Sequence, residues 1–514
     1  MLSKVTSFAL KGIEGCPVQV EIDLAAGLPT YATVGLPDAA VRESKERVVA
    51  AIRNSGFDFP LKRVTVSLAP AEIKKEGSQL DLAIAVGILL AAEQIHSKNS
   101  LDSCAFIGEL ALDGRLRPVS GALPMALQAR AMGFDCLIVP EGNREEVGVQ
   151  GLNVLWASTL RQVCDFLIGT QILNACKSLC LKTRGISSSA LDFHEVKGQS
   201  VAKRALEIAA AGGHNVLLIG PPGTGKSMLA QRVPTILPEA SLEEALEISR
   251  IYSVCGLLGG RGLLGQRPYR DPHHTISDVA LVGGGSVPKP GEISLAHGGV
   301  LFLDELPEFN RNTLEVLRQP LENRSITISR ARESLTFPAG FILISAMNPC
   351  PCGYRGHPDK SCLCTPLQIQ KYRSRVSGPL LDRMDLQVHL APVKFSEWSG
   401  KSVKEEDGSK SIRERVQKAR TIQKKRYEEM GILTNSQMGP RIIRRHCVLD
   451  KPGMDVLETA MAKLGLSARS LDRILKVART IADLEAVGNI SLEHLVEAIQ
   501  YRSLDRSMSS MVSV

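Results

Sequence analysis

A chain of 514 residues is too long for one ordinary hydrophobic core, so we expect two to four domains. Its 44% hydrophobic and 23% charged residues are typical of a soluble globular protein, and no apolar run approaches the roughly 20 residues of a membrane span. The N-terminus lacks the apolar core of a signal peptide, so we expect a cytoplasmic protein whose 12 cysteines are thiols or metal ligands. A net charge of +8 permits a polyanionic partner without requiring one.

Residues 1–170 are predicted to form a separate α/β domain, because short apolar runs alternate with helical segments. The predicted strands are Val18–Ile22, Val64–Leu68, Ala105–Ile107 and Cys136–Val139. The predicted helices are Ala39–Asn54, which Gly56 would end, and Leu80–Ala92. The sequence of this region contains no phosphate-binding glycine loop.

Two segments of this region, Gly-Leu-Pro-Asp at 35–38 and Gly-Glu-Leu-Ala-Leu-Asp-Gly-Arg at 108–115, resemble the Lon-protease-like domain. That fold is shared by the proteolytic module of Lon and the tail of the RadA recombination protein, and Lon uses a serine–lysine dyad. Here Gln79 occupies the serine position, with Ser78 one place out of register, and Leu123 occupies the lysine position. Leucine cannot activate a nucleophile. We therefore expect a scaffold and oligomerisation domain rather than a protease.

Residues 171–192 are predicted to be an inter-domain linker, because glycine, serine and charged residues interrupt the pattern there. Periodicity returns at Val201–Ala211, a predicted helix closed by Gly212 and Gly213. The apolar run Val216–Ile219 that follows is too short for a buried helix and typical of a parallel core strand.

A glycine-rich loop follows this strand directly and fills every fixed position of the pattern G-x-x-x-x-G-K-[ST]. Its residues are Gly220, Pro221, Pro222, Gly223, Thr224, Gly225, Lys226 and Ser227. The glycines let backbone N–H groups point at a phosphate, and the next helix, which Pro234 is expected to interrupt, adds the positive end of its dipole. We expect Lys226 to reach the β- and γ-phosphates of ATP and Ser227 to bind Mg²⁺.

Two more predicted strands end in polar residues. Residues 298–305 end in Asp304 and Glu305, of which Asp304 can hold the Mg²⁺ shell and Glu305 can polarise the attacking water. Residues 341–347 lead to Asn348, whose amide is suited to sensing the γ-phosphate and positioning water. The alternative for Asn348 is a turn-forming role before Pro349.

These ordered motifs resemble the AAA+ ATPase superfamily, which implies a P-loop parallel α/β/α core over residues 193–393. Residues 378–385 resemble a segment of MCM helicases and magnesium-chelatase ATPase subunits whose arginine projects into the neighbouring subunit's nucleotide. The resemblance implies that Arg383 is an arginine finger, which would stabilise charge on the transferring phosphoryl group. A surface salt bridge is the alternative.

The C-terminal part is expected to form a helical lid over residues 394–506, followed by a disordered tail at 507–514. Ser467 is predicted to cap a helix with an apolar face. Arg469, in the first turn of that helix, matches the sensor-2 arginine of AAA+ lids in MCM-like proteins, and a solvated arginine is the alternative.

A cysteine-rich loop at 348–365 brings four thiols close together in sequence: Cys350, Cys352, Cys362 and Cys364. Four thiolates could bind one tetrahedral Zn²⁺ ion, with an iron–sulfur centre as a second metal option. The C-x-C spacing departs from common zinc ribbons, and His357 could replace one thiol. A redox-sensitive or merely packed loop is the non-metal alternative, and the other eight cysteines are interpreted as small core residues.

Basic residues surround this loop in the sequence. Arg324, Arg330 and Arg332 lie in or near a predicted hairpin at 326–335, which resembles the pore-lining pre-sensor-1 insertion of MCM-type ATPases. Lys371–Arg375 adds a basic segment with an aromatic residue, and Asp271–His274 belongs to a long loop before the second motif. Basic loops that face a pore would follow a phosphate backbone, whereas a solvated face is the alternative.

Domain order and motifs together resemble the YifB/ComM family of magnesium-chelatase-like ATPases over nearly the whole chain. The resemblance implies a homo-hexameric ring that uses ATP and Mg²⁺ to move on single-stranded or branched DNA, with a role in branch migration when incoming DNA is recombined. No membrane partner is expected. The alternative function is a magnesium-chelatase-like ATPase that remodels a protein partner; we expected the N-terminal domain to argue against it, because related chelatases lack such a domain.

Overall fold

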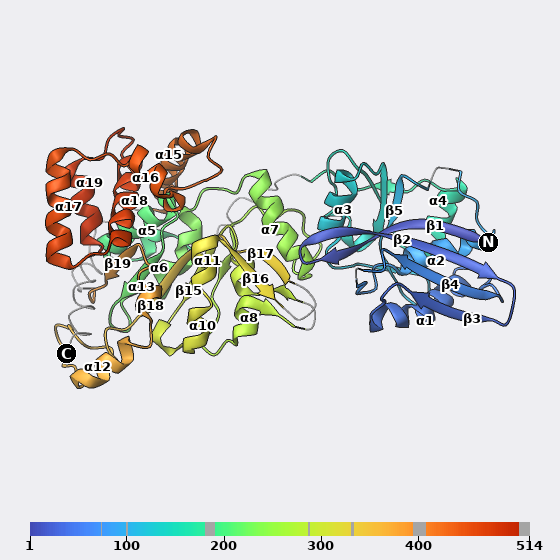
Figure 1. The fold of residues 1–514 in the computed structure, drawn as a ribbon, viewed down its shortest axis with the longest axis horizontal. Coiled ribbons are helices and arrows are strands. Elements are labelled where there is room, and N and C mark those ends of the chain that lie inside the picture. Colours follow the sequence, from blue (N-terminus) through green and yellow to red (C-terminus); the bar gives the residue numbers. More distant parts are fainter. Residues whose placement is uncertain are drawn as a thin grey trace. The chain divides into compact units, whose positions relative to one another are not determined.

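The computed structural model describes residues 1–72, 74–98, 101–179, 191–285, 288–329, 334–393 and 408–502. These residues form two compact units (Figure 1). The first unit comprises the described residues up to 179 together with Ser241–Gly265, and the second comprises the remainder. We expected residues 193–393 to form one continuous core, so the assignment of Ser241–Gly265 to the first unit corrects that boundary. Among the described residues, no helix combines the length and the apolar character that crossing a membrane requires.

The first unit is built on an eight-stranded mixed sheet with the order β10-β9-β8-β5-β1-β2-β4-β3. Four of its strands correspond to the predicted ones: β2 (Glu14–Ala25), β4 (Arg63–Ala69) and β8 (Cys136–Pro140) cover theirs, and β5 (Cys104–Phe106) ends one residue before its predicted end. Four others were not predicted: β1 (Leu2–Lys11), β3 (Thr30–Val34), β9 (Asn153–Ala157) and β10 (Asn174–Ala175). Because β10 pairs with β9, the unit extends beyond the predicted end at residue 170 into the predicted linker.

Helices cover this sheet. Helix α1 (Ala39–Asn54) has the predicted bounds, and α2 (Asp81–Ala91) lies within the predicted helix and packs on β1 and β2. The unit also contains α3 (Ala122–Ala131), α4 (Leu160–Ile168) and the short pair β6 (Glu109–Leu110) and β7 (Leu116–Arg117). Alternate residues of β2, including Val18, Val20 and Ile22, are fully buried, which is the period of two expected for a strand with one face on a core.

Helix α7 (Leu242–Val254) belongs to the first unit and packs on α3, although it follows the phosphate-loop helix in the chain. Ser253 connects the two helices: its carbonyl accepts from Gly121 N at 2.9 Å and its hydroxyl accepts from Leu123 N at 3.3 Å. The same hydroxyl donates to Glu146 Oε2 at 3.2 Å, and Glu146 also accepts from Asn143 Nδ2. Burial raises the pKa of Glu146 to about 7.

The second unit contains a five-stranded sheet with the order β12-β15-β18-β11-β19, in which every paired strand is parallel. Its strands are β11 (Val216–Ile219), β12 (Tyr269–Arg270), β15 (Val300–Leu303), β18 (Ile342–Met347) and β19 (Leu386–His389). Every residue of β11, β15 and β18 is buried, as is typical of parallel strands with both faces covered. The three strands predicted to lead into polar residues are therefore confirmed, and they are neighbours in one sheet.

Helix α5 (Ser200–Gly212) matches the predicted helix, and α6 (Lys226–Ile236) follows the phosphate loop. The expected interruption at Pro234 was wrong, because α6 continues through it to Ile236. Pro234 lies in the last turn of α6. The hydrogen bond that its missing N–H group cannot form is therefore lost only near the end of the helix, where the helix would stop in any case. The shorter helices are α8 (Asp278–Val282), α9 (Glu292–Leu295), α10 (Arg311–Glu315), α11 (Arg318–Asn323), α12 (Pro366–Arg373) and α13 (Gly378–Leu381).

Two short hairpins complete this unit. Strands β13 (Gly283–Gly284) and β14 (Lys289–Pro290) pair with each other, as do β16 (Ser325–Ser329) and β17 (Ser334–Pro338). The second pair confirms the predicted hairpin, with Ser329 opposite Ser334. Arg330 and Arg332 lie outside the described residues.

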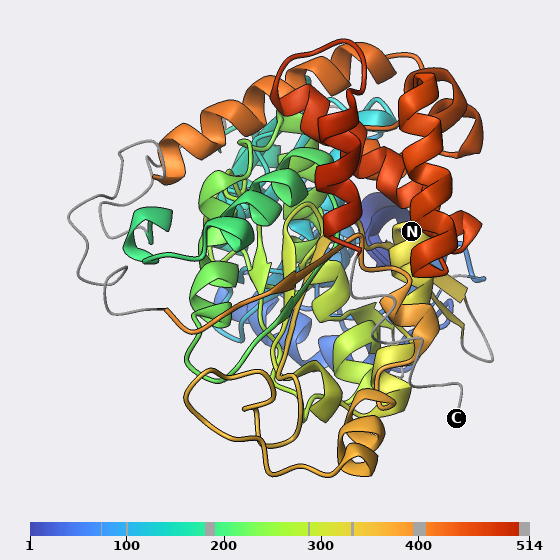
Figure 2. The ribbon, with the colours of Figure 1, turned by 90° about the vertical axis from the view of Figure 1, so that its left-hand side faces the viewer.

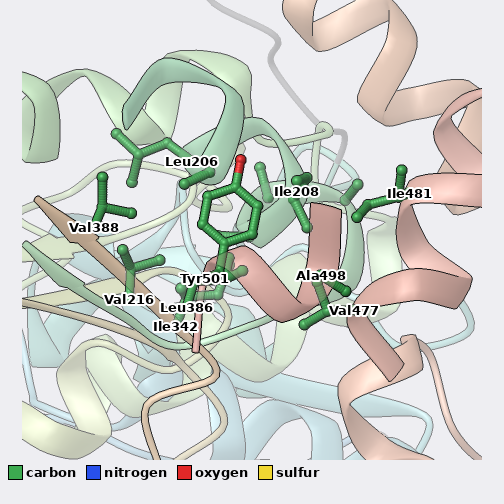
Figure 3. Packing of buried hydrophobic residues seen from close by; sticks show 14 of the residues in the cluster. Leu206, Ile208, Val216, Ile342, Leu386, Val388, Val477, Ile481, Ala498 and Tyr501 are labelled. Atoms are coloured by element: carbon green, nitrogen blue, oxygen red, sulfur yellow. The ribbon is translucent and has the colours of Figure 1, made fainter. Parts of the chain in front are cut away.

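Within the described residues 408–502, five α-helices form the predicted lid: α15 (Ser409–Tyr427), α16 (Pro440–His446), α17 (Lys451–Leu464), α18 (Ala468–Leu484) and α19 (Leu492–Gln500). Figure 2 shows them in orange and red beside the green helix α5, on which α15 and α18 pack. In Figure 3, Leu206 of α5, Val388 of β19 and Tyr501 after α19 lie in one cluster. The lid and the sheet therefore share a hydrophobic core. Residues 394–407 and the predicted tail at 507–514 lie outside the described residues.

Candidate functional site

The phosphate loop joins the carboxyl end of β11 to the first turn of α6. Gly223 and Gly225 have φ values of 78° and 87°, in the left-handed region that glycine adopts without a steric penalty. At Gly220 the constraint is space, since an added Cβ would lie 2.7 Å from the carbonyl oxygen of Leu390. Thr224 Oγ1 donates to the Pro221 carbonyl at 2.9 Å. The residue types of the loop thus follow from its backbone conformation and close packing.

The Lys226 ammonium group lies inside the loop. Its Nζ donates to the carbonyls of Gly220 at 2.7 Å and Pro221 at 2.9 Å, and to Asn348 Oδ1 at 3.2 Å. Burial lowers the pKa of Lys226, while the carboxylates of Asp304 and Glu305 act in the opposite direction. All three acceptors are neutral oxygens, and an anionic phosphate would be a stronger partner for the same amine. The structure therefore brings two predicted site residues, Lys226 and Asn348, into contact.

Ser227 and Asp304 form the second contact of the site. Ser227 Oγ donates to Asp304 Oδ2 at 2.6 Å. This hydrogen bond joins the first turn of α6 to the residue that follows β15. A hydroxyl and a carboxylate are hard oxygen ligands of the kind that Mg²⁺ prefers. The two residues predicted to hold Mg²⁺ therefore lie next to each other and fit that ion.

Glu305 lies at the exposed side of the site with φ = 51°, in the left-handed region. Its Oε2 is 3.4 Å from Nδ1 of His274, whose ring lies 4.1 Å from that of His273, centroid to centroid. We had assigned these histidines only to a long loop, so their position beside Glu305 was missed. Asp271, in the same loop, has its pKa raised by burial and by the charge of Asp304. The site therefore contains a third carboxyl group, Asp271, besides Asp304 and Glu305.

The two predicted arginines are placed differently from these residues. Arg383, after α13, is 8% exposed; it donates to the Pro379 carbonyl and forms an ion pair with Glu322 of the same chain. Arg469 is exposed in the first turn of α18, for which Ser467 is the N-cap as predicted. Among the described residues, neither arginine forms a hydrogen bond or an ion pair with Lys226 or Asp304. Their roles across a subunit interface stay predictions.

A buried polar cluster that sequence analysis missed lies between the sheet and the lid. Asp385, just before β19, is 3.4 Å from His214 Nδ1 and 3.5 Å from Arg473 Nη1 of α18. Burial alone would raise the pKa of Asp385, but the adjacent His214 ring and the charge of Arg473 hold it well below its usual range. Arg473 lies one turn after Arg469 and connects the lid helix to the segment that carries Arg383.

The four predicted cysteines lie together, with their Sγ atoms all within 4.8 Å of one another. The separations are 3.4 Å for Cys350–Cys352 and 3.6 Å for both Cys350–Cys362 and Cys352–Cys362. The option that His357 replaces a thiol is not supported, because its Nδ1 accepts from the Asp359 N–H at 3.0 Å and the described cluster contains four cysteines without it. A thiol cluster suited to one soft metal ion is therefore present.

The dyad positions of the Lon-like domain are also occupied as the sequence indicated. Gln79 is buried and its Nε2 donates to the Glu76 carbonyl at 2.6 Å, while Leu123 is fully buried in α3. Ser78 Oγ donates to Glu109. Among the described residues, the hydrogen-bond partner of Ser78 is therefore a carboxylate and not a lysine.

Comparisons with known proteins agree with this geometry. A family model described as "Magnesium chelatase, subunit ChlI" matches residues 192–398, and one described as "Magnesium chelatase, subunit ChlI C-terminal" matches residues 406–502. A third, "Subunit ChlI of Mg-chelatase", matches residues 20–143. The N-terminal domain therefore does not argue against a chelatase-like function, contrary to our expectation.

Three relatives illustrate the similarity. The chain is 45% identical over 507 residues, 98% of each chain, to "Uncharacterized protein YifB" of Escherichia coli. It is 43% identical over 514 residues, 99% of each chain, to "Competence protein ComM" of Haemophilus influenzae. A shorter similarity, 28% over 240 residues, covers 46% of this chain and 30% of "Probable DNA helicase MCM9" of Arabidopsis thaliana. The chain belongs to the YifB/ComM family of magnesium-chelatase-like AAA+ ATPases.

Proposed function

We propose that the chain is an ATP-hydrolysing, ring-forming AAA+ motor that acts on DNA in the cytoplasm. The specific activity proposed is that of a branch-migration helicase or translocase of the ComM type, used when incoming DNA is recombined. The observation that carries the ATPase is the convergence of Lys226, Ser227, Asp304 and Asn348 at the carboxyl edge of one parallel sheet. This edge is where nucleotides bind in open α/β sheets.

Each residue has a distinct role in the proposed hydrolysis. Lys226 exchanges its carbonyl and amide acceptors for phosphate oxygens, and Asn348, in contact with it, orients the attacking water. Glu305 accepts a hydrogen bond from that water and increases its nucleophilicity. Mg²⁺, held by Ser227 and Asp304, supplies neutralisation of the phosphate charge when it is bound. Zn²⁺ in the cysteine cluster is the remaining proposed cofactor.

The DNA-directed part of the proposal is supported by relatives named for competence and for DNA helicase activity, and by the net charge of +8. The basic segment contributes less than its sequence suggested. Arg373 donates to the Pro349 carbonyl at 3.3 Å and Arg375 is 2.7 Å from Glu308, so both have partners within the chain. Lys371 and Arg324 are exposed and could contact a phosphate backbone.

The ATPase rate with single-stranded, double-stranded and four-way branched DNA tests this proposal. We expect a several-fold increase with DNA, largest for single-stranded or branched forms, and a decrease of that stimulation as salt rises. Heparin is the matched polyanion control, because charge alone would give it the same effect. The Glu305→Gln chain controls for contaminating ATPases.

A second function remains open because all three family-model matches carry chelatase descriptions. A chelatase-like motor would use the same ATP site to remodel a protein partner. A rate that no DNA form changes, together with stimulation by a protein from the same source, would select this second function.

The proposed assembly is a homo-hexamer, since the Arg383 finger would serve the ATP site of the adjacent subunit. In the chain described here Arg383 is bound to Glu322, so the finger role requires exchange of that ion pair on assembly. Light-scattering mass with and without ATP measures the state directly. A monomer at micromolar protein with saturating ATP and Mg²⁺ would contradict the ring.

A further inference from the structure

The cysteine cluster has the dimensions of a single-ion site. A tetrahedral Zn²⁺ ion with Zn–S bonds of about 2.3 Å places its sulfurs about 3.8 Å apart. The Sγ separations among Cys350, Cys352 and Cys362, from 3.4 to 3.6 Å, are close to that value. An iron–sulfur cluster distributes its cysteines over several iron atoms and would need them further apart. The backbone N–H of Cys352 also points to Cys364 Sγ at 3.4 Å, a contact that stabilises a thiolate.

Little besides these thiols holds the loop. Residues 348–365 contain neither helix nor strand, and no residue from 354 to 365 is buried. Leu363, between two of the cysteines, is 88% exposed. The remaining contacts are small and local, such as the Lys360 ammonium 4.8 Å from the Tyr354 ring centre. A segment without a hydrophobic core of its own needs a cross-link to keep one shape, and a structural metal supplies one.

This loop forms one wall of the phosphate site. Gly353 has φ = 82°, and a Cβ added there would lie 2.6 Å from Pro222 Cδ, so its backbone rests on the phosphate loop. The same Cβ would be 3.9 Å from Cγ of Asn348, the residue that accepts from Lys226. Cys350 is two residues after Asn348 and is buried, while Arg373 holds Pro349 between them.

We propose that Cys350, Cys352, Cys362 and Cys364 bind one Zn²⁺ ion that fixes this wall, so that ATP affinity depends on metal occupancy. With the ion bound, the Cys350–Cys352 turn holds Gly353 against Pro222 and Asn348 beside Lys226. Without it, the turn is released, and Gly353 and Asn348 are no longer held beside the phosphate loop where ATP would bind. The inference rests on the proposed ATP site but is independent of DNA.

Metal content and ATP binding are measured separately. We expect about one zinc per chain in protein purified under reducing conditions. The Cys362→Ser/Cys364→Ser double variant should lose the zinc and bind a fluorescent ATP analogue about fivefold more weakly, the effect of one ordinary hydrogen bond. Cys176→Ser, a half-exposed cysteine of the first unit, is the matched control and should change neither quantity.

The Gly353→Ala variant tests the Gly353–Pro222 contact without removing a zinc ligand. The four thiols remain, so zinc should stay at one per chain, while the added methyl group displaces Pro222 and weakens ATP binding. To exclude misfolding, zinc is removed from the unaltered protein with a thiol reagent and a chelator, and reduction plus added Zn²⁺ should restore the affinity.

Native protein without zinc, or with iron in its place, would overturn the zinc site. Metal-free protein that binds the analogue as tightly as loaded protein would overturn the coupling. Failure of the loaded protein to bind ATP at all would instead refute the proposed ATP site, whatever its zinc content.

Discussion

Replacement of Glu146 by glutamine should change how the stability of the first unit depends on pH. The carboxyl group is buried, accepts from Asn143 and Ser253, and has a pKa of about 7 in place of an ordinary 4.5. Between these two pH values the folded chain keeps a proton that the unfolded chain releases. Glu146 therefore lowers the free energy of unfolding progressively as pH rises from about 4.5 to about 7, and its effect is constant above that.

The size of the effect follows from the shift. Raising the pKa of Glu146 from 4.5 to about 7 corresponds, at 1.36 kcal/mol per pH unit, to a loss of at most about 3 kcal/mol in the free energy of unfolding. Glutamine keeps the shape and an oxygen acceptor for Ser253 but stays neutral. The stability of the Glu146→Gln chain relative to the unaltered protein should increase by up to about 3 kcal/mol as the pH rises from about 4 to 8.

Urea unfolding followed by the fluorescence of Trp156 in β9 measures this unit. The chain has two tryptophans, so Trp398→Phe in every variant leaves Trp156 as the only reporter. Asp81 also has a raised pKa, about 6, and contributes a similar slope, but it is common to both chains and cancels in the difference. Glu145→Gln, the neighbouring half-buried carboxyl, controls for loss of a negative charge. Parallel stability curves for the Glu146→Gln and unaltered chains across pH 5–8 would refute the reasoning.

Two further predictions concern the ATP site. Lys226→Ala should abolish nucleotide binding, because the lysine contacts phosphate in the ground state. Glu305→Gln should bind ATP but hydrolyse it slowly, because Glu305 acts on the attacking water. Equal loss of ATP affinity in the two variants, measured by equilibrium titration, would contradict these roles. Arg383→Ala should bind ATP yet lose roughly 10³ to 10⁵ in hydrolysis rate, and mixing it with Lys226→Ala chains should restore some activity, since a few interfaces combine an intact loop with an intact finger. Glu322→Gln controls for the broken ion pair, and no recovery at any mixing ratio after verified subunit exchange would remove the trans role.

The parts of this structure that sequence analysis predicted depend on local patterns. The strand, loop and helix around Lys226 are consecutive, and the apolar runs before Asp304 and Asn348 are long enough to identify buried strands. The prediction that Lys226, Asp304 and Asn348 belong to one ATP site rested on the resemblance to AAA+ ATPases. The four cysteines cluster as expected because only a short loop separates the two pairs.

The features that were missed depend on non-local contacts. His274 lies beside Glu305 because β12 pairs with β15, and this non-sequential strand order leaves no local signal. The Arg383–Glu322 ion pair joins residues 61 positions apart. His357 was considered as a ligand because of its place between the cysteine pairs, but its ring turns to the Asp359 backbone. Helix α7 was not predicted, and nothing local in its sequence indicates which unit its apolar residues contact.

The membership of α7 in the first unit has a consequence for cutting the chain into fragments. A recombinant piece that starts at residue 191 would carry Leu242–Val254 without the α3 surface on which it packs, and Leu246 would lose the apolar cluster that includes Leu123 and Ala126. A piece ending at residue 179 would lack the Ser253 hydroxyl that Glu146 and Leu123 contact. Neither unit can be excised as one continuous stretch. A domain swap should therefore move residues 241–265 together with the N-terminal sheet. The two units are interleaved in the sequence, because residues 241–265 of the first unit interrupt the chain of the second.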